Sequence, residues 1–277
     1  MTDATSLRRH WGSAEDVGIQ ATRTPDVAIE TFDIDGQIRI RVVRPAGEPE
    51  VLPVVLFTHG AGWILGDDFT YDGLTRELAL RARAAVVFVD YRHSGENRFP
   101  AAVQECRAAL EWVIAHAARL TVDATRIAVA GDAAGAAIAV AVAMSAKDRL
   151  VGQVLLYPMI DGFDTVSYHR RATEHWIMRQ SGMWRQVRRS EPAVVTRRAD
   201  ERLTGMPPAL VVVAEADVLR EQGEGYAAGL RAAGVSAVTE RYEGLIHDFV
   251  MVDTLGETAA AKVATEHASA YLRYVLR

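Results

Sequence analysis

Gly131-Asp132-Ala133-Ala134-Gly135 directly follows the apolar run Ile127-Ala128-Val129-Ala130 and opens into an alanine-rich stretch over 134–147. A continuous apolar run of this length is typical of a strand buried on both faces of a sheet. A small-residue turn between such a strand and a helix is typical of a nucleophile elbow, which lifts a strained central residue at the carboxyl edge of the sheet. The central residue here is Ala133, and its methyl group cannot attack a carbonyl carbon.

Apolar runs recur along the chain and predict an α/β fold with a mostly parallel, eight-stranded sheet. Helical stretches that separate most of these strands predict right-handed crossovers, so that helices cover both faces of the sheet. Residues 28–34 and 37–42, joined by Asp35-Gly36, are predicted to form a hairpin. The other predicted strands are 54–57, 85–89, 127–130, 154–156, 210–213 and 237–242, and the predicted helices are 72–83, 99–119, 134–147 and 258–276.

Two side chains with reactive groups are predicted to be packed in helices. Cys106 lies in the helical pattern of 99–119, which favours a buried thiol over a reactive one. His267 lies on the stripe predicted for the last helix and is expected to be a packed histidine. That stripe consists of Val263, His267, Ala270, Tyr271, Tyr274 and Val275.

Length and composition favour one domain over residues 1–277, since 49% of the residues are hydrophobic and suffice for a large core. The net charge of −5 argues against a nucleic-acid partner. A single cysteine excludes an internal disulfide and suits a reducing compartment.

Residues 1–11 lack the apolar centre of a secretion signal, and the apolar stretch 133–144 is shorter than the ~20 residues that span a bilayer. We therefore expect a soluble, cytoplasmic protein without membrane contact.

Residues 162–205 interrupt the alternation of strands and helices and are predicted to form a lid over the carboxyl edge of the sheet. Residues 1–25 are polar with a few apolar anchors and are expected to lie across another part of the molecule. Arginines outnumber acids in 162–205, although the chain as a whole is acidic. The arginines suit binding of an acidic substrate or an acyl-carrier partner. The simpler alternative is that they form the solvated face of a helix. His169 and His175 do not match a metal-site spacing, so we expect no metal and no organic cofactor. The arginines are Arg170, Arg171, Arg179, Arg185, Arg188, Arg189, Arg197 and Arg198.

Three further features fit an acyl-transfer site around the elbow. His59-Gly60-Ala61-Gly62-Trp63 follows a predicted strand, and glycines there let backbone N–H groups approach a substrate oxygen. Asp217 follows the strand 210–213, and His247 lies beyond the last strand. Elbow, acid and histidine in this chain order match a Ser–His–Asp site at the strand ends. Read singly, Asp217 would be a helix cap and His247 a structural histidine.

The sequence resembles the bacterial hormone-sensitive-lipase branch of the α/β-hydrolases over nearly its whole length. The resemblance implies an α/β-hydrolase fold with a helical lid, to which residues 1–25 contribute, and carboxylesterase activity on short or medium acyl esters. It places position 133 as the nucleophile site, Asp217 as the group that orients His247, and the N–H groups of Gly60, Ala61 and Ala134 as the oxyanion hole. The matching motifs are His59-Gly60-Ala61-Gly62-Trp63, Asp90-Tyr91-Arg92, Phe99-Pro100-Ala101-Ala102, Gly131 to Gly135, Leu156-Tyr157-Pro158, Pro207-Pro208-Ala209, Asp217 and His247.

Several positions depart from the family pattern. Ala133 replaces the serine, Ala61 a glycine, and Asp248 the glycine that follows the histidine. Other departures are Ala136-Ala137 for Gly-Asn, His93 to Asn97 for Leu-Ala-Pro-Glu-His, and Val218 for a proline. The tryptophans Trp11, Trp63 and Trp184 either line an apolar substrate pocket or pack the lid.

The missing serine leaves three interpretations open. In the first, Ala133 is an engineered substitution that inactivates an ordinary serine esterase and traps its substrate. In the second, the chain lost its serine naturally and uses His247–Asp217 as a general base. In the second case an oxyanion hole beside a base suits elimination, dehydration or cyclisation of a carbonyl substrate. In the third, the protein binds a small ligand without chemistry, as the family's plant hormone receptors do. Retention of the acid–histidine pair argues against this last interpretation.

Overall fold

The computed structural model describes residues 26–36, 38–60, 68–92, 99–160, 166, 201–251 and 258–277. Eight strands form one sheet in the order β1-β2-β4-β3-β5-β6-β7-β8. β2 runs antiparallel to both of its neighbours, and the other adjacent pairs from β4 to β8 are parallel. The predicted α/β fold and its eight strands are confirmed. The strands are β1 (Val27–Ile34), β2 (Ile38–Pro45), β3 (Leu52–Thr58), β4 (Ala85–Asp90), β5 (Val122–Asp132), β6 (Gly152–Leu156), β7 (Ala209–Ala214) and β8 (Ala237–Tyr242).

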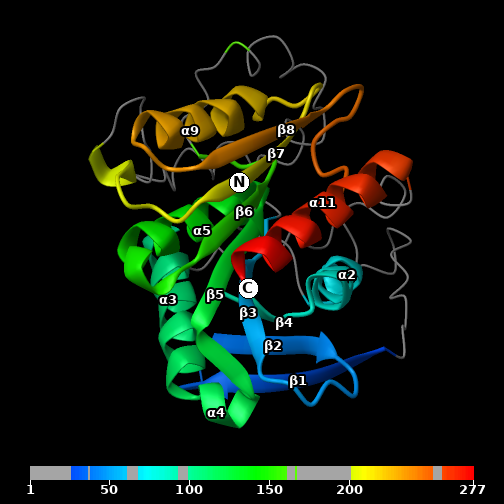
Figure 1. Cartoon of the computed structure of the whole chain (residues 1–277), viewed down its shortest axis with the longest axis vertical. Coiled ribbons are helices and arrows are strands. Elements are labelled where there is room, and N and C mark those ends of the chain that lie inside the picture. Colours follow the sequence, from blue (N-terminus) through cyan, green and yellow to red (C-terminus); the bar gives the residue numbers. More distant parts are fainter. Residues whose placement is uncertain are drawn as a thin grey trace, which may run out of the picture.

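Helices lie on both faces of this sheet, with α2 and α11 on one side and α3 and α5 on the other (Figure 1). The sequence predicted one helix over 99–119, whereas the structure has two, and it predicted none over 220–232. The described helices are α2 (Asp72–Ala82), α3 (Phe99–Ala115), α4 (Ala117–Leu120), α5 (Ala133–Ser145), α9 (Arg220–Ala232) and α11 (Ala259–Val275), with the short 3₁₀ turns η3 (Lys147–Arg149) and η4 (Glu201–Leu203).

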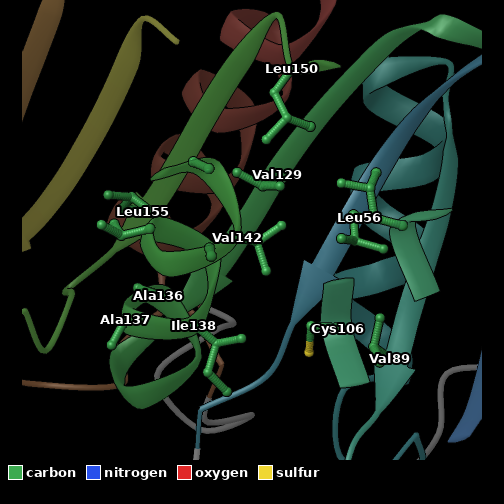
Figure 2. Close-up of a cluster of buried hydrophobic side chains, with 14 of the residues drawn as sticks. Leu56, Val89, Cys106, Val129, Ala136, Ala137, Ile138, Val142, Leu150 and Leu155 are labelled. Atoms are coloured by element: carbon green, nitrogen blue, oxygen red, sulfur yellow. The ribbon is translucent and has the colours of Figure 1, made fainter. Parts of the chain in front are cut away.

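The central strands contain continuous apolar runs because each face of the sheet has its own core. Alternate residues of a strand point to opposite faces. Leu56 and Val129 pack with α3, α5 and α9, whereas Phe57 and Ala130 pack with α2 and α11. Figure 2 shows part of the first core, where side chains of α3 and α5 meet those of β3, β4 and β5. Cys106 is completely buried there, and burial raises the pKa of its thiol, which confirms a packing role.

The stripe predicted for the last helix is only partly correct, since Tyr271 and Val275 are half-buried against the core. Val263, His267 and Tyr274 are exposed, and the buried face of α11 consists of Ala261, Ala264, Ala268, Ser269 and Leu272. The small side chains of this face let α11 lie close to the sheet. The His267 Nδ1 atom lies 3.0 Å from Glu240 Oε2 and 3.1 Å from the Tyr242 hydroxyl, at the surface rather than in the core.

Close backbone contact fixes the start of α5 against the end of β3. A Cβ atom at Gly135 would overlap the carbonyl oxygens of Thr58 and His59, and a Cβ atom at Gly131 would lie 2.7 Å from the carbonyl oxygen of Thr58. The Thr58 hydroxyl also donates to the Gly135 carbonyl at 2.8 Å. The two glycines of the elbow are therefore required by packing, because backbone atoms cannot move aside as a side chain can.

Gly135→Ala is expected to destabilise the fold by about 3 kcal/mol or more, since it overpacks backbone against backbone. Thermal unfolding followed by circular dichroism checks this, and a fall in Tm of several degrees is expected. The control is Gly225→Ala in α9, where the new Cβ atom meets nothing within 4 Å. That change should stabilise the helix by about 0.5–1 kcal/mol. Equal Tm values for the two variants would contradict the packing account.

The lid predicted for residues 1–25 and 162–205 lies almost wholly outside the described residues. Of the second segment, residue 166 and residues from 201 onward are described, and η4 lies in the latter part. None of the helices in the described ranges is long and apolar enough to cross a membrane.

Candidate active site

The carboxyl ends of the four neighbouring strands β5, β6, β7 and β8 bring the predicted site residues to one edge of the sheet. Ala133 follows β5 directly, and Asp217 lies three residues beyond β7. His247 follows β8, and its ring meets the ring of Tyr157, which follows β6, edge to face at 5.0 Å between centroids. The sequence singled out Ala133, Asp217 and His247, and this edge is where parallel sheets gather their sites.

The elbow keeps its strained form although it lacks a serine. Ala133 is the first residue of α5 and has φ +45°, a left-handed conformation that side chains with a Cβ atom rarely adopt. Its carbonyl accepts a hydrogen bond from the Met159 N–H at 2.9 Å. Strained backbone persists where the surroundings over-determine it, and it clusters at functional sites. Position 133 therefore has the backbone of a nucleophile site and the side chain of an inert residue.

Asp217 and His247 form the acid–histidine pair that the chain order predicted. The His247 Nδ1 atom lies 2.8 Å from Asp217 Oδ2, and the other carboxylate oxygen accepts the Leu219 N–H at 2.8 Å. Asp217 is completely buried and His247 is nearly so. A buried carboxylate held from its own loop fixes the orientation of the ring. In a Ser–His–Asp triad the same arrangement leaves Nε2 as the nitrogen that faces the serine.

A second carboxylate lies at the opposite nitrogen of the same ring. Asp248 Oδ1 is 3.3 Å from His247 Nε2. Asp248 has φ +62°, a conformation natural to the glycine that the family pattern has at this position. The sequence marked Asp248 as a departure from the pattern, but gave it no role.

These carboxylates set the charge of the site. Burial disfavours the charged ring, but Asp217, Asp248 and Asp132 outweigh it and raise the pKa of His247 to about 10. Burial and the charge of Asp248 raise the pKa of Asp132 to about 7, although the hydrogen bond from the Tyr71 hydroxyl lowers it. At neutral pH His247 is therefore an imidazolium, which donates protons and does not accept them.

The structure shows a hydrogen bond for one predicted oxyanion donor, Gly60, and a position at a helix N-terminus for another, Ala134. The Gly60 N–H donates to the Tyr71 hydroxyl at 3.0 Å, and that hydroxyl donates to Asp132 Oδ2 at 2.9 Å. The Gly60 N–H would reach a substrate oxygen only by leaving Tyr71. Ala134 is the second residue of α5, where N–H groups at a helix N-terminus favour negative charge. The oxyanion roles of Gly60 and Ala134 stay predictions.

Sequence reasoning missed Tyr71, which lies eleven residues beyond Gly60 and sixty-one before Asp132. It is completely buried, and nothing in the local pattern distinguishes it from a core aromatic. Ala61 and the predicted substrate-binding tryptophans Trp11, Trp63 and Trp184 lie outside the described residues, as do the arginines of 170–198. Within the described ranges, no group of three or more His, Cys, Asp and Glu side chains has a metal-binding arrangement.

A model of the α/β-hydrolase fold family matches residues 55–251, which contain the elbow, Asp217 and His247. The chain belongs to the α/β-hydrolases. Its relatives place it in the hormone-sensitive-lipase-like branch, together with carboxylesterases.

Similar α/β-hydrolases include esterases of known sequence and structure. The carboxylesterase NlhH of Mycobacterium tuberculosis is 37% identical over 246 residues, which are 82% of this chain and 76% of the relative. A thermostable esterase from Pseudomonas putida has a TM-score of 0.86 at 36% identity, covering 99% of this chain and 96% of the other. A serine-to-alanine variant of an esterase, crystallised with (S)-Ac-CPA, has a TM-score of 0.85 at 36% identity and covers 99% and 95%.

Proposed function

We propose that this α/β-hydrolase binds small carboxylic esters or related carbonyl compounds over the elbow between β5 and α5, and that the chain as written does not form an acyl-enzyme. One observation carries the proposal. The elbow keeps its left-handed φ of +45° and the acid–histidine pair its 2.8 Å contact, although Ala133 offers no nucleophile. The esterase relatives supply the substrate class.

The missing nucleophile lowers the turnover rate more than any other feature of the site. Removing the serine of a Ser–His–Asp protease costs on the order of 10⁶-fold in kcat. Binding suffers far less, because the oxyanion donors and the pocket walls contact the substrate independently of the serine. The esterase variant crystallised with (S)-Ac-CPA supports this, since it carries alanine in place of a serine and still holds a ligand. The proposal is the same whether Ala133 arose by natural divergence or by an engineered substitution.

Non-hydrolytic chemistry at His247 is the second candidate function. The observation that favours it is the retained Asp217–His247 pair, for which a purely binding protein has no need. Because His247 is protonated at neutral pH, elimination or cyclisation driven by proton abstraction would accelerate as the pH rises toward the pKa of about 10. A rate that falls with rising pH would instead assign the ring the role of general acid.

Substrate charge and cellular setting complete the proposal. The arginines between 170 and 198 support an acidic acyl substrate or an acidic carrier protein, whose affinity would then fall as salt screens the charges. The single cysteine, Cys106, is buried and free, in keeping with a reducing cytoplasmic setting.

Ligand-observed NMR with ethyl butyrate tests the binding proposal on the unaltered protein. The ester is expected to bind and to remain intact over the hours of the measurement. Ala133→Leu places a large side chain over the elbow and is expected to abolish the signal. Ala28→Leu makes the same change on β1, at an exposed position, and should leave binding unchanged.

Two outcomes would overturn the proposal: no binding by the unaltered protein, or equal binding by Ala133→Leu. His247→Asn separates the two candidate functions. If His247→Asn binds the ester with unchanged affinity and converts every carbonyl substrate tried at an unchanged rate, ligand binding without chemistry is the remaining function.

A further inference from the structure

His247 contacts a carboxylate at each of its two ring nitrogens. Asp217 lies 2.8 Å from Nδ1 and Asp248 lies 3.3 Å from Nε2. In a Ser–His–Asp site, Nε2 is the nitrogen that takes the proton of the serine hydroxyl. Asp248 Oδ1 thus lies in charge contact with the ring nitrogen that takes the serine proton in such a site.

The backbone at Asp248 explains how a carboxylate comes to lie there. Its φ of +62° is left-handed, and the residue directly follows His247, so the side chain projects from the same turn that delivers the ring. Aspartate and asparagine tolerate this conformation better than most residues with a Cβ atom. The Asp248 side chain is 32% exposed, whereas that of His247 is 6% exposed.

The other charged and titratable groups around the ring come from neighbouring elements. Asp132, at the end of β5, adds a third carboxyl group, and Tyr71 hydrogen-bonds to it. Tyr157, after β6, meets the ring with its edge. Of these groups, Asp217 raises the pKa of His247 most, followed by Asp248 and then Asp132. Burial and the charge of Asp248 raise the pKa of Asp132 itself to about 7.

We infer that Asp248 takes the place of the missing serine as the partner of His247 Nε2 and holds the ring as an imidazolium, so that the site is locked against acting as a base at neutral pH. Asp248 is a positioning residue in this account, because it acts through His247. The inference rests on the proposed function, since it concerns the same ester site.

Direct titration of His247 tests the inference without any substrate. Two-dimensional ¹H–¹⁵N NMR of the imidazole nitrogens gives the protonation midpoint of the ring in the unaltered protein and in Asp248→Asn. Asparagine has nearly the same shape and tolerates the same backbone. The midpoint is expected to fall by about 1–2 pH units when the charge at Nε2 is removed. Asp35→Asn is the matched control, because Asp35 is exposed in the β1–β2 turn and also has a positive φ of +52°.

Kinetics in the serine-bearing background give the second readout. Ala133→Ser alone should hydrolyse p-nitrophenyl butyrate with an acid limb in its pH profile near the protonation midpoint of His247. Ala133→Ser/Asp248→Asn should shift that limb down by the same 1–2 pH units, which raises kcat/KM at pH 7.5 by about 10- to 100-fold. Asp248→Gly, the residue of the family pattern, should reproduce the shift.

The outcomes keep the two proposals apart. An unmoved His247 midpoint in Asp248→Asn would overturn the inference, whatever the kinetics. A shifted midpoint together with no ester binding and no hydrolysis at any pH would uphold Asp248 as the partner of the ring and overturn the proposed function.

Discussion

Ala133→Ser is expected to hydrolyse p-nitrophenyl butyrate at pH 9 at least about 10⁴-fold faster than the unaltered protein. Loss of the serine in a comparable triad costs on the order of 10⁶-fold. His247 has a pKa of about 10, so about a tenth of the rings are neutral at pH 9 and able to take the serine proton. The substitution needs no backbone change, because φ at position 133 is already +45°. Initial rates, corrected for spontaneous hydrolysis, measure the gain.

The control for this prediction is the double variant Ala133→Ser/His247→Asn, which keeps the hydroxyl and removes the base. Its rate is expected to return to that of the unaltered protein. A rate in Ala133→Ser no higher than in the unaltered protein at every pH from 6 to 10 would mean that the elbow no longer presents a side chain to the site. A gain that survives His247→Asn would mean that another group activates the serine.

The fold was predictable because its signals are local. The strands from β3 to β7 contain continuous apolar runs with both faces buried, so the absence of alternation in them was itself informative. α9 escaped notice since it contains Gly223, Gly225 and Gly229, which lower helix propensity. Two of these glycines are explained by packing: a Cβ atom at Gly223 would meet Val213, and one at Gly229 would meet Leu203.

The last helix shows why the buried face of a helix is harder to predict than its existence. Hydrophobic size directed the prediction toward Val263 and Tyr274, which are exposed, whereas the buried face of the helix consists mostly of alanines. Close approach of a helix to a sheet favours small residues, and a size-weighted stripe then points away from the core.

Within the site, the residues found from sequence are those whose chain order carries the chemistry. Ala133, Asp217 and His247 follow strands that end at the same edge, so their meeting follows from topology. Tyr71 and Asp248 act through contacts that topology leaves open. The hydroxyl of Tyr71 bridges Gly60 and Asp132, and the carboxylate of Asp248 depends on one left-handed residue. Asp248 was visible as a departure from the family pattern, and its meaning required the 3.3 Å contact.

Asp217→Asn, introduced into Ala133→Ser, is expected to lower kcat by about 10⁴-fold, the effect of the same change in a serine protease triad. An amide at position 217 still accepts the Leu219 N–H through its oxygen, and presents its NH₂ group to His247 Nδ1. The neutral ring must then carry its proton on Nε2, where it cannot accept the proton of the serine. Steady-state kinetics on p-nitrophenyl butyrate measure the loss, and KM should change little.

The matched control is Glu215→Gln in the same background. Glu215 lies two residues away and accepts the Gly244 N–H at 2.9 Å, in an exposed position away from the ring. An amide oxygen accepts that hydrogen bond equally well, so kcat should stay within about twofold of Ala133→Ser. Comparable losses in the two variants would make Asp217 a residue that holds its loop in place. A loss confined to Asp217→Asn, with unchanged thermal stability, would assign it the orientation of His247.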